Sequence, residues 1–258
     1  MNNNPTLDVM KYSFSSVSSF ETCPYGFKLT YLDAVPRESN FFSVFGSYCH
    51  DILEKFFRGE LEVWDLADYY EENYTKFMTI PPPPYPAGMG SQYFDDGLFF
   101  FENFEFDKDK YEILLIEDKI ELKHKDFSLV IKPDLILKNK ETGKLVLLDY
   151  KTSKLKGNKY DDKKMEDYKR QFYLYVFFYW IAKGIEIDKI FVWFIRNNQF
   201  KEIPIDRFKM QETIEWFENG ITKIKNEMEW KANTDKSNNY FCSFLCSVKN
   251  SCIYKQGT

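Results

Sequence analysis

The sequence is poor in long apolar runs, in excess positive charge and in histidine, of which there are only two. No apolar run approaches the roughly 20 residues that a membrane helix requires, so we expect no transmembrane segment. Residues 1–5 lack the basic-then-apolar order of a secretory signal. We therefore expect a cytoplasmic protein whose five cysteines remain reduced. The net charge of −5 argues against attraction of nucleic acid by the whole surface, but it does not exclude a local basic patch.

Hydrophobic side chains are abundant, at 44% of the 258 residues, and aromatic residues alone make up 19%. This composition excludes a disordered chain and supplies a large core. The length suits one large domain. We expect a single domain over residues 1–258, with a mainly helical part at 12–110, a core at 111–206, and a C-terminal helix with a cysteine cluster at 207–258.

One segment departs from the acidic average. Residues 151–170 carry eight Lys or Arg against four Asp or Glu, a local charge of +4, so the remainder of the chain carries −9. A solvated helix face explains such a run as well as a nucleic-acid contact does.

The spacing of apolar residues changes from a helical to an alternating pattern near residue 111. A serine-rich segment before Phe20 predicts a capped helix that carries Phe20, Cys23, Phe27 and Tyr31 on one face. Further helices are predicted at 46–58, 61–78, 91–106, 161–183 and 207–231. Strands are predicted at 113–117, 119–122, 127–131, 135–137, 145–150, 189–195 and 201–205, with the first five forming hairpins of one sheet. The order indicates an α/β or α+β fold.

Two aspartates and a lysine stand at the ends of neighbouring predicted strands. Asp149 ends one strand and Lys151 lies two residues beyond it, so both side chains project to the same face. Asp134 precedes the partner strand and reaches the same place if the two strands form a hairpin. Carboxylates hold Mg²⁺ or Mn²⁺ against a phosphate, and an ammonium offsets charge in the transition state of phosphodiester hydrolysis. An Asp-x-Lys pair by itself is more often a surface ion pair of little energy.

The longer pattern is more specific. Ile131-Lys132-Pro133-Asp134, followed by Asp149-Tyr150-Lys151-Thr152, resembles the PD-(D/E)XK nuclease motif, and Leu148 to Thr152 resembles its RecB form. The resemblance implies a restriction-endonuclease-like mixed sheet flanked by helices. It also implies that Asp134, Asp149 and the Tyr150 carbonyl bind Mg²⁺ or Mn²⁺ and that Lys151 is catalytic.

Two further segments resemble the same family. Gly46-Ser47-Tyr48-Cys49-His50 is similar to a helix whose histidine is a metal ligand, and His50 matches that position. Gln171 and Tyr175 match residues that orient the lysine or the phosphate, and four-residue spacing places them on one helical face. Taken alone, each is an ordinary core or surface residue. Glu117 corresponds more loosely to an acidic residue that supports the metal ligands.

Four of the cysteines form a separate pattern. Cys242, Cys246 and Cys252 follow C-x3-C-x5-C, and Cys23 stands far upstream. Three close thiols need a distant fourth ligand to complete a tetrahedral site. Four thiolates suit zinc or a [4Fe–4S] cluster, spacing alone favours zinc, and unmetallated thiols are a further alternative. Cys49 is interpreted as a buried core thiol.

The whole arrangement is similar to the iron–sulfur RecB-like nucleases, which include CRISPR adaptation exonucleases and the AddB-type nuclease domain. This resemblance implies a [4Fe–4S] cluster that clamps the N- and C-terminal segments together. We thus expect an exonuclease that acts on DNA ends, preferably single-stranded. The alternatives are a DNA-end-binding or processing subunit of a recombination or CRISPR adaptation complex, with an integrase or recombination protein as partner, and a metal-stapled structural protein. No G-x-x-x-x-G-K-[ST] helicase motif occurs, which indicates a nuclease without its own ATPase.

Overall fold

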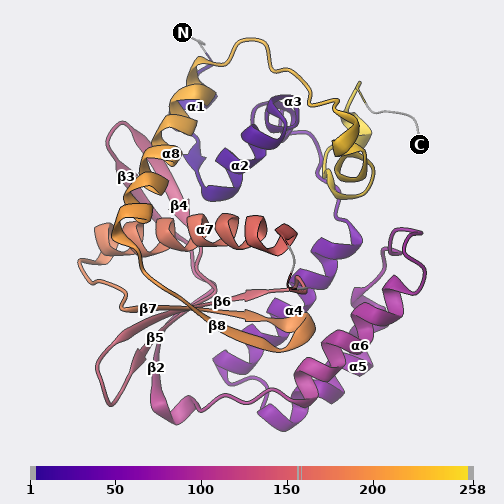
Figure 1. The fold of residues 1–258 in the computed structure, drawn as a ribbon, viewed down its shortest axis with the longest axis vertical. Helices are drawn as coiled ribbons and strands as arrows, with labels where there is room; N and C mark the ends of the chain where they lie inside the picture. The colour runs from indigo at the N-terminus through magenta and orange to yellow at the C-terminus, as the bar shows by residue number, and fades with distance from the viewer. Residues whose placement is uncertain (1–3, 156, 158, 255–258) are drawn as a thin grey trace. The chain divides into compact units, whose positions relative to one another are not determined.

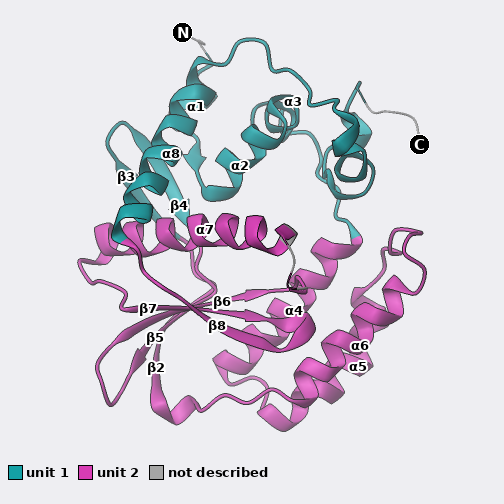
Figure 2. Ribbon diagram, in the orientation of Figure 1, with its two compact units in different colours: residues 1–40, 120–131, 207–258 teal, residues 41–119, 132–206 magenta. Residues whose placement is uncertain are grey.

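Helices dominate before residue 110, and five consecutive strands follow between residues 111 and 151, as the change in apolar spacing predicts. The computed structural model describes residues 4–155, 157 and 159–254 (Figure 1). These residues form two units (Figure 2): unit 1 comprises residues 1–40, 120–131 and 207–258, and unit 2 comprises 41–119 and 132–206. The ends of the expected domain, residues 1–3 and 255–258, lie outside the described residues.

Unit 2 contains a mixed sheet with the strand order β2-β5-β6-β7-β8. Its strands are β2 (Tyr111–Ile116), β5 (Leu135–Asn139), β6 (Leu145–Lys151), β7 (Lys189–Phe194) and β8 (Gln199–Ile203). β5 and β6 are antiparallel, with Leu135 opposite Leu148. β6 and β7 are parallel, with Asp149 opposite Val192. The carboxyl ends of β6 and β7 therefore meet at one edge of the sheet, where polar sites commonly form.

Helices cover both faces of this sheet. On one face, α4 (Phe41–Arg58), α5 (Leu66–Phe77) and α6 (Met89–Glu102) share a core with alternate sheet residues such as Leu148, Tyr150 and Trp193. The intervening residues of β6 and β7 point to the opposite face, along which α7 (Lys159–Lys183) lies (Figure 1). Burial of large side chains on both faces stabilises the sheet by about 1.5–3 kcal/mol each. The mixed sheet and flanking helices agree with the expected fold class.

Unit 1 holds the remaining strands, and the expectation of one sheet is wrong. β3 (Ile120–His124) and β4 (Phe127–Ile131) form the predicted hairpin, but β4 pairs next with β1 (Lys11–Tyr12), in the order β1-β4-β3. This pairing joins segments more than a hundred residues apart, which local spacing does not reveal. The unit's helices are α1 (Thr6–Val9), α2 (Phe14–Thr22), α3 (Pro24–Phe27) and α8 (Arg207–Asn226).

The first predicted helix is interrupted at Cys23. Ser13 caps α2 with a reciprocal bond to Ser16, as the serine-rich segment predicts. α2 ends at Thr22, and Pro24 begins α3 because proline suits the first helical position and lacks an N–H to continue the preceding helix. Cys23 thus lies between two helices, with extended backbone, and not on a continuous helical face.

Short turns complete both units. They are a π-helical turn at Lys28–Leu32, η2 (Val63–Asp65), η3 (Lys108–Lys110), η4 (Ile195–Asn197), η5 (Lys236–Asn238), a second π-helical turn η6 (Phe241–Leu245) and η7 (Lys249–Ser251). The helix predicted at 207–231 ends at residue 226. Among the described residues, none of the helices combines the length and apolar character that crossing a bilayer requires.

Candidate active site

The carboxyl end of β6 positions Asp149 and Lys151 on the sheet face toward α7. Asp149 is 1% exposed, and its Oδ1 lies 2.5 Å from Lys151 Nζ. The approach is close but not aligned as a hydrogen bond, so Oδ1 is a buried acceptor without an aligned donor among the described residues. A buried oxygen without a hydrogen-bond donor lowers the stability of the fold, unless another positive group binds to it.

α7 extends this pair into a chain of polar contacts. Lys151 Nζ donates to Gln171 Oε1 at 3.0 Å, and Gln171 Nε2 donates to the Tyr175 hydroxyl at 2.8 Å. The four-residue spacing of Gln171 and Tyr175 therefore does place them side by side, within reach of Lys151. Burial lowers the pKa of Lys151, but the Asp149 and Asp134 carboxylates outweigh burial and hold it above its ordinary value. Lys151 is accordingly an ammonium donor at neutral pH.

Asp134 reaches the site from the segment before β5. It is 8% exposed, and its Oδ2 accepts the Tyr150 backbone N–H at 2.7 Å. The antiparallel register of β5 and β6 brings it beside Asp149 because Leu135 pairs with Leu148. Burial and the Asp149 charge together raise the pKa of Asp134 to about 7, although His50 and Lys151 oppose that rise.

His50 on α4 meets a second carboxylate at the end of β2. Its Nδ1 lies 2.9 Å from Glu117 Oε1 and 3.7 Å from Asp134 Oδ1. Lys132 Nζ contacts the other oxygen of Glu117 at 2.6 Å. Burial opposes ionisation of Glu117, but its bonds to His50 and Lys132 prevail and lower its pKa. Burial likewise lowers the pKa of His50, yet the Asp134, Glu117 and Asp149 carboxylates raise it to about 9.

These contacts produce one group of candidate metal ligands among the described residues: one atom each from His50, Glu117 and Asp134, all within 4.8 Å of one another. Imidazole and carboxylate ligands suit a divalent cation such as Mn²⁺ or Mg²⁺. Burial and the neighbouring Asp149 charge raise the pKa of Asp134, and three carboxylates raise the pKa of His50, so a bound cation would offset the negative charge at the site. The residues therefore fit the divalent metal that the sequence predicts.

The group shares His50 and Asp134 with the predicted ligand set but includes Glu117 in addition. Glu117 stands in it directly, whereas the sequence assigned it only a supporting role. Its backbone φ of 53° lies in the left-handed region that side chains rarely adopt, and its N–H donates to the Asp134 carbonyl at 2.8 Å. A strained residue at a polar site is a signal of function, but it is visible only in the structure. Asp149 and the Tyr150 carbonyl, also expected as ligands, lie outside this group and remain predictions.

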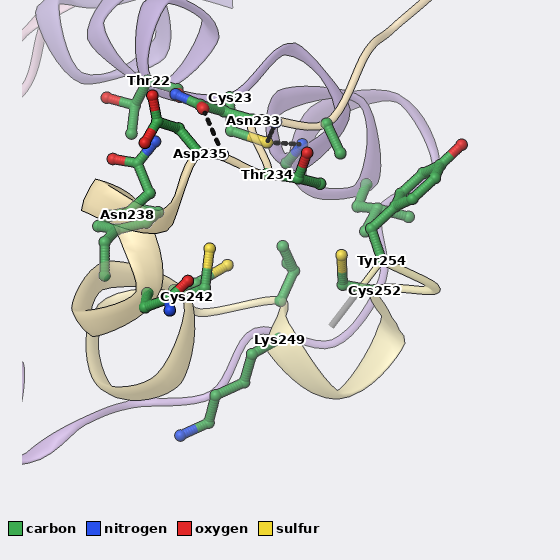
Figure 3. Close-up of a pocket in the computed structure, with 17 residues that line it drawn as sticks. Thr22, Cys23, Asn233, Thr234, Asp235, Asn238, Cys242, Lys249, Cys252 and Tyr254 are labelled. Carbon is green, nitrogen blue, oxygen red and sulfur yellow. Dashed lines mark hydrogen bonds between the residues drawn. The ribbon is translucent and has the colours of Figure 1, made fainter. Parts of the chain in front are cut away.

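The four spaced cysteines, all in unit 1, line a single pocket (Figure 3). Cys23 Sγ accepts backbone N–H groups from Gly26 at 3.3 Å and Asn233 at 3.4 Å. Within the described part of the chain, no three cysteine thiols lie within 4.8 Å of one another, so no compact thiol cluster is evident. Cys49 is fully buried in unit 2, as expected for a core thiol.

The basic run at 151–170 contains several internal ion pairs. Lys169 contacts Glu166 and Arg170 approaches Asp167 along α7, which is the pattern of a solvated helix face. Lys154 instead pairs with Asp96 on α6. Residues 156 and 158 of the run lie outside the described residues.

Comparison with known proteins agrees with the nuclease resemblance of the sequence. The model of the PD-(D/E)XK nuclease superfamily matches residues 11–253. No curated protein matches the sequence. Among solved structures, the crystal structure of SSO0001 aligns at 15% identity over 82% of this chain and 97% of that chain, with a TM-score of 0.34. Because the family match spans nearly the whole sequence, the chain belongs to the PD-(D/E)XK nuclease superfamily, which implies metal-dependent phosphodiester hydrolysis and a DNA substrate.

Proposed function

We propose that the protein is a metal-dependent exonuclease that hydrolyses phosphodiester bonds at DNA ends, preferentially in single strands. The observation that carries the proposal is the meeting of two polar groups around β6: His50, Glu117 and Asp134 on one side, and Asp149 with Lys151 on the other. The Asp134 bond to the Tyr150 N–H links them.

Each residue of the site has a distinct role in this proposal. His50, Asp134 and Glu117 would hold a divalent cation, and Asp149 with the Tyr150 carbonyl would complete its oxygen ligands. A cation bound there would polarise the phosphoryl group and acidify water. Lys151 orients the nucleophile and offsets charge on the phosphate by donation from Nζ. Gln171 holds that ammonium in place through Oε1, and Tyr175 holds the Gln171 amide.

A labelled linear single-stranded oligonucleotide incubated with Mn²⁺ tests the activity. We expect the parent to shorten it, and Asp149→Ala or Lys151→Ala to lower the rate by at least ~10²-fold, because each removes a group that acts on the transition state. Lys189→Ala is the matched control, since Lys189 pairs with exposed Glu202 at the opposite end of β7.

The same assay separates the finer alternatives. An exonuclease leaves circular single-stranded DNA intact and shortens linear single strands faster than duplexes. Cleavage by the alanine variants at the parent rate would overturn the proposal. DNA binding without any cleavage would instead support an end-binding subunit that hands DNA to an integrase or recombination partner.

We further propose that Cys23, Cys242, Cys246 and Cys252 hold a structural [4Fe–4S] cluster in a cytoplasmic, reducing setting. Two observations support it. The thiols line one pocket, and two backbone N–H groups already point at Cys23 Sγ, as they do around cluster ligands. A single zinc ion needs thiolates about 3.8 Å apart, given Zn–S bonds of about 2.3 Å. A cluster of several irons is larger and does not require thiols that close, and no three of the described cysteine thiols lie within 4.8 Å of one another.

Anaerobic purification tests the cofactor. We expect a brown protein with broad absorbance near ~400 nm and iron and sulfide in equal amounts. Cys252→Ser should lose most of the colour, whereas Cys49→Ala should keep it because Cys49 belongs to the core of the other unit. A colourless preparation with stoichiometric zinc would refute the iron–sulfur assignment and leave the nuclease proposal untouched.

A further inference from the structure

A charged cluster beside the catalytic strand has no part in the chemistry described above. Asp96 on α6 pairs through Oδ1 with Lys154 Nζ at 2.8 Å and through Oδ2 with Arg196 Nη2 at 2.8 Å and Nε at 3.0 Å. One carboxylate thus faces two cations, which leaves the cluster with a net charge of +1.

The two cations differ in accessibility. The Arg196 side chain is 9% exposed, and its guanidinium stacks 3.4 Å from the centre of the Tyr93 ring. It is held on both sides and neutralises Asp96. The Lys154 side chain is 32% exposed, and among the described residues its ion-pair partner is Asp96. An ammonium has three N–H donors, so Lys154 retains donors for a ligand.

The position of the cluster relates it to the active site. Lys154 follows Lys151, the last residue of β6, by three residues, a span of at most about 11 Å. Arg196 follows β7 at its carboxyl end, where Phe194 pairs with Lys151. Both cations therefore lie beyond the same edge of the sheet as the catalytic lysine. With a rise of about 3.4 Å per base along a nucleic-acid helix axis, a distance of at most about 11 Å corresponds to no more than about three nucleotides.

We propose that Lys154 binds a backbone phosphate of the substrate strand within about three nucleotides of the scissile bond, and that Asp96, anchored by Arg196, positions it. This inference rests on the proposed nuclease function, because it needs a nucleic-acid strand in the site. Asp96 holds the ammonium through one oxygen while its own charge is already balanced by Arg196. The surplus positive charge is then available to a phosphate, and the contact carries no base specificity.

Binding of a fluorescent single-stranded oligonucleotide to the full chain, without added divalent cation, tests the contact. For each phosphate neutralised on a single strand, the slope of log affinity against log salt changes by about 0.7. We expect Lys154→Gln to make the slope shallower by about 0.7 and to weaken binding about five- to tenfold at 50 mM salt. Lys154→Arg should restore the slope because it keeps the charge.

Lys189→Gln is the control, since it removes the same charge from a paired lysine of similar exposure, 39%, at the other end of the strands. It should leave the slope unchanged.

In cleavage assays Lys154→Gln should raise KM about five- to tenfold and change kcat less than twofold, as expected for uniform binding. A parent-like slope in Lys154→Gln would overturn the inference, as would equal slopes in the two glutamine variants. Absence of cleavage by the parent would count against the nuclease function alone, because the salt slope is measured without cleavage.

Discussion

Asp134 interacts electrostatically with every charged group of the candidate cation site. It is buried, it lies beside Asp149, and its pKa of about 7 means that ionisation in the folded, cation-free protein is unfavourable. A group whose folded pKa is raised stabilises the fold below its unfolded pKa, near 3.9, and loses that contribution as pH rises through the folded value. The contribution of Asp134 to the stability of the cation-free protein should therefore fall between about pH 4 and pH 7.

Asp134→Asn tests this linkage. Asparagine cannot ionise and still offers an oxygen to the Tyr150 N–H, so the variant should gain stability over the parent as pH rises. At pH 8 in EDTA we expect a difference of about 2–4 kcal/mol, and at pH 4 nearly none. Urea denaturation across that pH range measures it. A difference that does not change with pH would show that the Asp134 charge is not the cause.

Among the secondary-structure elements of unit 2, the packing of α5 against α6 depends on one glycine. Gly97 of α6 faces Tyr70 of α5 so closely that a Cβ there would lie 2.3 Å from the Tyr70 hydroxyl. The Tyr70 hydroxyl donates a hydrogen bond of 3.2 Å to the backbone carbonyl of Phe94, which lies on α6 with Gly97. The contact lets α5 and α6 approach without a side chain between them.

Gly97→Ala should accordingly destabilise the protein by about 1–3 kcal/mol, since the ring must move out of a packed core. Gly90→Ala in the same helix is the comparison, because a Cβ there meets only Pro82 side-chain atoms, at 3.3 Å and 3.8 Å. It should change stability less, because the higher helical preference of alanine offsets part of the cost of the tighter contact. Thermal unfolding of both variants checks the order, and equal losses would contradict the packing argument.

At the scale of the whole molecule, cation binding should stabilise the folded protein by mass action. A divalent cation at 100 times its dissociation constant adds about 2.7 kcal/mol to the free energy of unfolding. The candidate ligands become available as Asp134 and His50 lose their protons, so this gain should increase with pH.

His50→Ala should remove most of the thermal shift caused by Mn²⁺. His124→Ala is a natural control because the chain has only two histidines, and His124 contacts Glu218 in unit 1. It should keep the parent's shift. If His50→Ala responds to Mn²⁺ as the parent does, the cation binds elsewhere.

Features of the fold and the site that depend on neighbouring residues differ from those that depend on segments far apart in the chain. The amino-acid sequence by itself determined the apolar strand β6, the cap of α2, and the placing of Asp149 and Lys151 on one face, because strand period and helix capping depend on neighbouring residues. The four-residue spacing of Gln171 and Tyr175 is of the same kind.

Only the tertiary structure decided that Glu117 joins His50 and Asp134, that Asp96 ties the ends of β6 and β7 to α6, and that the β3–β4 hairpin leaves the central sheet. Each of these features joins segments that are far apart in the chain. Their contacts depend on how whole elements pack and on which burial of charge the fold tolerates, and no local spacing of residues encodes that.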